Sequence, residues 1–173
     1  MTPSPVKKRR RSAQEITIIA LLAALALIFS YVEAIIPYTP GIPGIKLGVA
    51  NLVTVLALYK LSAKHAAAVN GVRIFFAGLL FSGVFGMLYS LAGATLSLLG
   101  MMLLKKTNLF SMAGVSMAGG VLHNIGQVLV AALLIADLRI VYYLPVLLLS
   151  GTLSGLAIGV AAQLIAARLP EVR

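Results

Sequence analysis

The sequence contains no cysteine, which excludes disulfides and thiolate metal sites. Two histidines remain, His65 and His123, and they make a poor zinc site because structural zinc takes four protein ligands. We therefore expect neither a metal centre nor a bound cofactor. The lack of thiols leaves the redox compartment open.

Charge is also scarce. Charged residues make up 10% of the sequence and hydrophobic residues 61%, whereas soluble domains are about half apolar and about a quarter charged. No soluble fold of this size could bury so much apolar surface, so lipid must be the solvent for most of the chain. Helices and closed barrels are the structures that satisfy their backbone in lipid, and long unbroken apolar runs favour helices. The sequence predicts an all-α, polytopic membrane protein.

Acids are fewer still, with four against 14 basic residues. Five of the basic residues form one run, Lys7–Arg11, immediately before the first apolar segment. This placement is typical of a membrane topology signal rather than of nucleic-acid binding, so the lipid bilayer is an expected partner and nucleic acid is not. Residues 1–15 are interpreted as a basic cytoplasmic segment and residues 16–169 as one transmembrane domain.

Six crossings are predicted in that domain. An S-x-x-E capping box at Ser12–Glu15 is expected to start the first helix. The apolar stretch Ala66–Leu104 is about twice the ~20 residues that one crossing needs, so it must fold back, near Ser82 to Gly86. The predicted spans are 16–36, 45–61, two within 66–104, 109–136 and 141–167.

Basic residues orient this bundle. With both termini in the cytoplasm, 11 of the 14 basic residues fall on the inner side, Lys46 and Arg139 fall on the outer side, and Arg73 lies within a span. A multi-pass protein of the cell membrane with cytoplasmic N- and C-termini is therefore predicted. Asp137 is expected to pair with Arg139 in an outer link.

Small residues recur at helix-packing intervals. Gly151, Gly155 and Gly159 form a double G-x-x-x-G, and Ala20 with Ala24 forms A-x-x-x-A. Such stripes let helix backbones approach closely in lipid. The glycine stripe favours packing inside the bundle, whereas the alanine pair could pack internally or contact a separate membrane subunit.

Polar side chains also occur inside the predicted spans. Arg73 lies about midway along the third span, and a central arginine normally faces the bundle interior and has a partner. His123 and Gln127 are four residues apart and share a helical face. The predicted site residues are Asn51, Arg73, His123, Asn124 and Gln127, with Lys46 at the outer mouth.

Any one of these residues could simply hydrogen-bond a neighbouring helix as interior packing. Together they leave positive charge without enough internal acid, since Glu33 is the only acid in a predicted span and is expected near the outer surface beside Lys46. Guanidinium groups pair bidentately with phosphate or carboxylate. We therefore expect an outward-opening pocket for a small anionic solute, roofed by the Pro/Gly-rich loop Pro37–Gly44.

The runs Gly44–Asn51 and His123–Gln127, with Gly114–Ser116, Arg73, Ser90–Gly93 and Pro145, resemble the small bacterial family called Gx transporters. That family is also labelled heptaprenyl diphosphate synthase component I, and the resemblance covers essentially Ile16–Leu169. The family is similar to the substrate-binding S components of energy-coupling factor transporters, which are six-helix proteins of the bacterial inner membrane that capture a micronutrient on the outer side.

The resemblance implies an S-component-like bundle that works with a transmembrane coupling protein and ABC-type ATPases. Ala20 and Ala24 would then be candidate contacts for the coupling protein. The chain has no Walker A pattern, so ATP-driven transport would need such partners.

The synthase label meets a chemical objection. A prenyl transferase needs clustered aspartates to hold magnesium against a diphosphate, but this chain has one aspartate, Asp137, and three scattered glutamates. We expect no enzyme activity from it. A non-catalytic membrane accessory of heptaprenyl diphosphate synthesis stays open as the alternative function, and so does a small carrier that acts alone.

Overall fold

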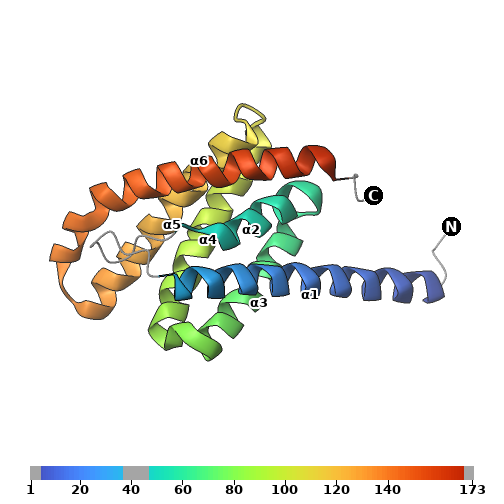
Figure 1. Ribbon diagram of the computed structural model, residues 1–173, viewed down its shortest axis with the longest axis horizontal. Coiled ribbons are helices and arrows are strands. Elements are labelled where there is room, and N and C mark those ends of the chain that lie inside the picture. The colour runs from blue at the N-terminus through green and yellow to red at the C-terminus, as the bar shows by residue number, and fades with distance from the viewer. Residues whose placement is uncertain (1–4, 37–46, 170–173) are drawn as a thin grey trace.

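The computed structural model describes residues 5–36 and 47–169, so Lys46 and the predicted roof Pro37–Gly44 lie outside the described residues. Within the described ranges the chain is helical and has no strand, which confirms the all-α prediction (Figure 1). The α-helices are α1 (Pro5–Ile35), α2 (Val49–Lys60), α3 (Ala63–Ala77), α4 (Gly83–Thr107), α5 (Met112–Ile135) and α6 (Leu144–Arg168).

Four helical stretches are long and apolar enough to cross a membrane, as in a multi-pass membrane protein. They are residues 13–35, 63–107, 112–135 and 138–168. Helix α2 is apolar but has only 12 residues, so it rises about 18 Å, less than the ~30 Å thickness of the hydrocarbon core.

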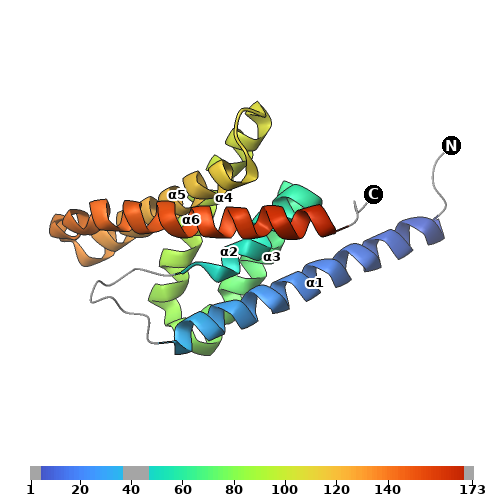
Figure 2. The same ribbon diagram turned by 45° about the horizontal axis from the view of Figure 1, so that its top comes forward.

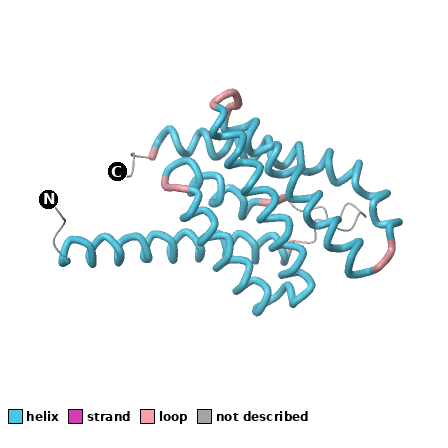
Figure 3. Tube along the Cα trace, turned by 180° about the vertical axis from the view of Figure 1, so that it is seen from behind, coloured by secondary structure: helices cyan, strands magenta, loops and turns pink. Residues whose placement is uncertain are grey.

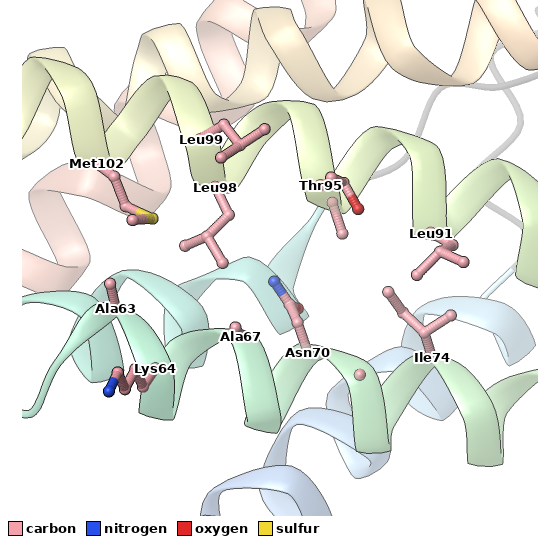
Figure 4. Close-up of a pocket in the computed structure, with 12 residues that line it drawn as sticks. Ala63, Lys64, Ala67, Asn70, Ile74, Leu91, Thr95, Leu98, Leu99 and Met102 are labelled. Carbon is pink, nitrogen blue, oxygen red and sulfur yellow. The ribbon is translucent and has the colours of Figure 1, made fainter.

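The stretch 63–107 is a pair of antiparallel helices. Helix α3 runs on through one π-helical turn, η1 (Gly78–Ser82), and Gly83 then adopts φ 68° and ψ 177°, a backbone conformation that glycine permits. Beyond the turn, Leu91 lies opposite Ile74 and Met102 opposite Ala63 (Figure 4). The reversal lies where the sequence predicted it, and the ring of Phe81 packs on Tyr31 of α1 at 5.7 Å between centroids.

The predicted start of the first helix was wrong. Helix α1 begins at Pro5 and runs unbroken through Ser12–Glu15, so this S-x-x-E pattern is not a capping box. Lysine and arginine are good helix formers, and the basic run before Ser12 extends the helix instead of ending it. The apolar part, Ala13–Ile35, matches the predicted first span closely.

Helices α5 and α6 pack against each other along most of their lengths (Figure 2). A Cβ atom added to Gly155 would lie 2.6 Å from the carbonyl oxygen of Ser116, and one added to Gly159 would lie 2.6 Å from Cα of Ala113. Both distances are shorter than real Cβ contacts. The glycine stripe therefore packs inside the bundle, as predicted.

The other half of the core joins α1, α2 and α3. Ala23 and Ala26 of α1 are buried against Val53 of α2 and Val69 of α3. Ala20 and Ala24 lie on the exposed side of α1. This alanine pair is therefore not covered by the described part of the chain and remains open to lipid or to a partner.

Several helix ends meet at one end of the molecule. Lys60 Nζ, at the end of α2, donates to the carbonyl oxygen of Leu169 at 3.1 Å, just after α6. Lys105 Nζ, near the end of α4, donates to Leu58 O at 2.6 Å and lies 4.7 Å from the centre of the Tyr59 ring. The first turns of α1 and the last turns of α6 lie toward the same end, and the link between α5 and α6 lies at the other (Figure 3).

Asp137 and Arg139 occupy that link, which continues into a short 3-10 helix, η2 (Leu138–Tyr143). Arg139 Nη2 lies 2.7 Å from Asp137 Oδ2, and the backbone N–H of Arg139 donates to Asp137 Oδ1. The predicted pairing is confirmed. Hydrogen bonds from Arg139 lower the pKa of the Asp137 carboxyl below its usual range.

Candidate functional site

Five of the six predicted site residues line one small cavity between the helices. Asn51 comes from α2, Arg73 from α3, and His123, Asn124 and Gln127 from α5. The cavity volume is about 60 Å³. Lys46, the sixth predicted residue, lies outside the described residues, so its place at the mouth stays a prediction.

Among the described residues, the hydrogen bonds of Arg73 go to neutral groups. Its side chain is 9% exposed, Nη1 donates to Ser30 Oγ at 3.2 Å, and Nη2 donates to Asn70 Oδ1 at 3.2 Å. Its Nε is buried and has no hydrogen-bond partner in the described part of the chain. The guanidinium is thus fixed in orientation and retains an unused donor.

Asn70 ties this arginine to the core. Its Oδ1 accepts hydrogen bonds from Arg73 and, at 3.0 Å, from the hydroxyl of Thr54 on α2. Asn70 and Arg73 are three residues apart on α3, so they lie on neighbouring turns of one face. The asparagine therefore orients Arg73 and links α2 to α3.

Glu33 also lines the cavity. Its Oε1 accepts a hydrogen bond from the backbone N–H of Gly48 at 2.5 Å. No salt bridge joins Glu33 to Arg73; within residues 5–36 and 47–169 the one salt bridge is Asp137–Arg139. The cavity therefore contains a carboxylate together with the arginine, and its excess of positive charge is smaller than the sequence suggested.

Sequence reasoning missed this role of Glu33 because the predicted partner was Lys46. One signal was available. Ser30 and Glu33 are three residues apart and share a face of α1, and Ser30 is the residue that contacts Arg73. The face of α1 that carries Glu33, the only acid in a predicted span, is therefore also the face that contacts Arg73, the only arginine in a predicted span.

Gly48 starts α2 at the cavity wall. Its φ of 73° is in the left-handed region, where glycine is favoured over residues with a side chain. In this conformation its N–H reaches Glu33, and its carbonyl oxygen accepts from the N–H of Asn51 at 2.8 Å. The glycine of the L-G-V-A-N run therefore places the first turn of α2, with Asn51, at the cavity.

The α5–α6 crossing closes another wall. A Cβ atom on Gly151 would lie 2.7 Å from both Gly120 O and Asn124 Nδ2, so these backbones are in direct contact. Asn124 Nδ2 donates to the carbonyl oxygen of Leu147 at 2.5 Å. Part of the hydrogen-bonding capacity of Asn124 thus joins two helices, as the interior-packing interpretation suggested for single polar residues.

His123 and Gln127 lie on the face of α5 that meets α4. Both line the cavity, and a Cβ atom on Gly93 would lie 3.0 Å from His123 Cε1 and 3.0 Å from Gln127 Cγ. Ser90 and Ser154 complete the polar lining, and the sequence had marked only Ser90, as part of the Ser90–Gly93 stretch. Among the described residues, no group of three or more His, Asp or Glu side chains is placed to hold a metal ion.

Residues 22–165 match the protein family described as heptaprenyl diphosphate synthase component I. The chain belongs to this family. The match confirms the family that the Gly44–Asn51 and His123–Gln127 runs indicated, while the similarity to S components stays a prediction. A search of curated proteins and one of solved structures found no significant match. The family description refers to one component of a synthase.

Proposed function

We propose that this chain is the substrate-binding membrane subunit, similar to an S component, of an energy-coupled micronutrient transporter. It captures a small anionic solute on the outer side of the membrane. The observation that carries the proposal is the buried Arg73, held by Ser30 and Asn70 in the wall of a polar cavity, with its Nε unused. A guanidinium in this state favours a carboxylate or phosphate partner.

The start of α2 adds a second group that favours anions. The first N–H groups of a helix lack intrahelical partners and carry the positive end of its dipole. In membrane transport proteins, helices that begin within the bundle direct these ends at anionic substrate groups. Helix α2 begins beside the cavity, and Gly48, Ala50 and Asn51 line it together with Arg73.

The cavity size limits what it can hold. A water molecule needs about 10–15 Å³ of such volume, so 60 Å³ corresponds to an anionic head group rather than a whole vitamin. We propose that the anionic group of the solute enters beside Arg73. The rest of the solute then extends from the cavity towards the outer side.

The proposed topology has six crossings, with both termini in the cytoplasm. The reversal at Gly83 supports two crossings within residues 63–107. The hydrogen bonds of Lys60 and Lys105 support a common side for the ends of α2, α4 and α6, and that side carries most of the basic residues. Short basic ends of this kind favour the cytoplasm.

The proposed partners are a transmembrane coupling protein and ABC-type ATPases. The chain has no Walker A pattern with which to hydrolyse ATP itself. Ala20 and Ala24 support the assignment of α1 as the contact helix, because both are exposed along the side that the core leaves free. We propose no catalytic role for the chain.

Native mass spectrometry of the full chain, gently extracted from its host membrane, tests the binding function. We expect a retained small molecule on the wild type and its loss from Arg73→Met and Gln127→Ala. Arg139→Met is the matched control, because Arg139 lies in an exposed link and should leave retention unchanged. Equal retention by both cavity variants, with unfolding temperatures that show intact folds, would contradict the proposal.

The family name favours a second candidate, a non-catalytic membrane accessory of heptaprenyl diphosphate synthesis. A diphosphate would also pair with Arg73. Co-purification separates the two: the transporter reading predicts recovery with a coupling protein and ATPases, and the accessory reading predicts recovery with a soluble prenyl synthase.

A further inference from the structure

A second hollow, the α3–α4 groove, is lined in part by Asn70, the residue that also accepts a hydrogen bond from Arg73 of the polar cavity. Its volume is about 370 Å³, and its lining is almost entirely apolar. Figure 4 shows it between the two antiparallel helices, with Ala63, Ala67 and Asn70 on one side and Leu91, Leu98 and Met102 on the other. None of the five predicted site residues that the structure describes lines it.

The groove exists because the facing side of α3 is small. Ala63, Ala67 and Gly71 recur every four residues, and a Cβ atom built on Gly71 would meet nothing within 4 Å. Water does not fill such an apolar space, and an empty one loses the dispersion contacts of its walls. A hydrocarbon chain from the surrounding bilayer would restore those contacts.

The length of the groove matches one leaflet. From Ala63 to Ile74 helix α3 rises about 16 Å, and half of the ~30 Å hydrocarbon core is about 15 Å. Residues from both ends of this interval line the groove. A single acyl chain could therefore lie along it from the bilayer surface to near the midplane.

The positive charge of Lys64 at one end of the groove favours a lipid with an anionic headgroup. Lys64 lines the groove beside Ala63, is exposed, and makes no hydrogen bond or ion pair with the described residues (Figure 4). The neighbouring Lys60 and Lys105 instead bond to backbone carbonyl groups. Basic groups at such a site favour anionic lipid headgroups, each by about 1 kcal/mol near the membrane surface.

We infer that the α3–α4 groove binds one acyl chain of an anionic phospholipid, whose headgroup pairs with Lys64. The lipid belongs to the leaflet at the Lys60–Lys64 end of the bundle. Only the naming of that leaflet as cytoplasmic rests on the proposed function and its topology. The site itself is separate from the polar cavity.

Native mass spectrometry of the full chain tests this inference, using detergent micelles that contain equal amounts of phosphatidylglycerol and phosphatidylcholine. We expect the wild type to retain phosphatidylglycerol about 5-fold more than phosphatidylcholine. Lys64→Gln should remove that preference. Arg168→Gln, at another exposed basic position, should keep it.

Gly71→Phe should fill the groove and reduce retention of both lipids, because its Cβ enters open space. Val72→Phe introduces the same side chain at an exposed neighbouring position and should retain lipid as the wild type does. Ala67→Leu serves as a second groove-filling variant if Gly71→Phe unfolds. Unchanged lipid retention in the folded groove variants, or an unchanged preference in Lys64→Gln, would overturn the inference.

Two further measurements distinguish the phospholipid site from a prenyl-chain site and from the polar cavity. Farnesyl diphosphate at equal concentration should not displace the phospholipid; displacement would overturn the phospholipid assignment in favour of a prenyl chain. Arg73→Met should keep the lipid but lose the solute, whereas Gly71→Phe should lose the lipid but keep the solute. The two proposals therefore fail separately.

Discussion

Helix α3 contributes Arg73 to the polar cavity and Ala67 and Gly71 to the α3–α4 groove, and the two hollows differ in how small residues are packed. At the cavity, Gly120 of α5 meets Gly151 of α6, and the backbones touch. At the groove, Ala67 of α3 faces Leu98 of α4 and a hollow remains (Figure 4), which Gly71 also lines. A stripe of small residues therefore closes a helix pair where its partner is small as well, and can leave space where it is not.

The two hollows also differ in the charge of their linings. Residues of all six helices surround the cavity and supply Arg73, Glu33, His123 and several amides and hydroxyls. Two helices form the groove, and among the described residues Lys64, at one end, is the only charged residue in its lining. The cavity is suited to a compact polar group, and the groove to a hydrocarbon chain with a charged head.

The largest expected difference in stability comes from placing a leucine in the wall of each hollow, at Gly151 for the cavity and at Gly71 for the groove. Gly151→Leu forces a leucine into the Gly120 backbone and Asn124, so it should destabilise the fold by about 3 kcal/mol or more. Gly71→Leu enters open space and should change stability by less than about 1 kcal/mol. Thermal unfolding in detergent measures both; equal losses would show that the two interfaces are packed alike.

Arg73→Met should separate binding from stability. Loss of a buried charge partner weakens binding by about 2–5 kcal/mol, which is about 30-fold or more. The fold itself should be as stable as the wild type or more so, because a buried cation without an ion pair gives way to an apolar side chain. Arg73→Lys should bind at an intermediate level, since lysine lacks the bidentate geometry.

The measurement for Arg73→Met is the ratio of solute-bound to free protein in native mass spectra, beside the unfolding temperature. A fold that weakens in step with binding would instead assign Arg73 a structural role.

Glu33→Gln should produce a smaller effect of the opposite sign. Glutamine can still accept the hydrogen bond from Gly48, but the negative charge in the cavity wall is gone. The anionic solute should bind about 3- to 10-fold more tightly, because a like charge nearby is removed. In the Arg73→Met background the same removal of negative charge should also raise the bound-to-free ratio, from a much lower starting value. Weaker solute binding by the single variant would show that Glu33 contacts the solute as an acceptor.

The smallest effect belongs to Asp137, which lies away from both hollows. Its pKa is lowered by Arg139, so the stabilisation is present at neutral pH and is lost as the pH falls through that lowered pKa. The ion pair is exposed, so Asp137→Asn should shift the unfolding temperature by about 1 °C or less at pH 7. Once the pH lies well below that lowered pKa, the two proteins should unfold alike. A large shift would mean that the link braces the α5–α6 pair.

Much of this architecture could be predicted because hydropathy and residue spacing act locally. The long run 66–104 required a reversal, and the four-residue interval between His123 and Gln127 placed both on one face. The prediction that these two residues share a cavity with Arg73 and Asn51 followed from the cost of exposing polar groups to lipid, which favours their burial in a shared interior.

The remainder depends on tertiary distances. Ser12–Glu15 matched a cap pattern, yet the preceding residues continue the helix. The place of Glu33 in the cavity depends on how α1 packs on α3, and the groove depends on how far α4 lies from Ala67 and Gly71. Neither distance is encoded in spacing along one helix.

The central claim is that the cavity around Arg73 opens outward and favours anions. Since the chain has no cysteine, Ser90→Cys would place a single thiol in the cavity wall. Membrane-impermeant thiosulfonates of opposite charge, added outside intact cells, would report on it. We predict that the anionic reagent reacts about 10-fold faster than the cationic one, and that Arg73→Met removes the difference. Equal rates with Arg73 in place, or labelling only from the cytoplasmic side, would contradict the account.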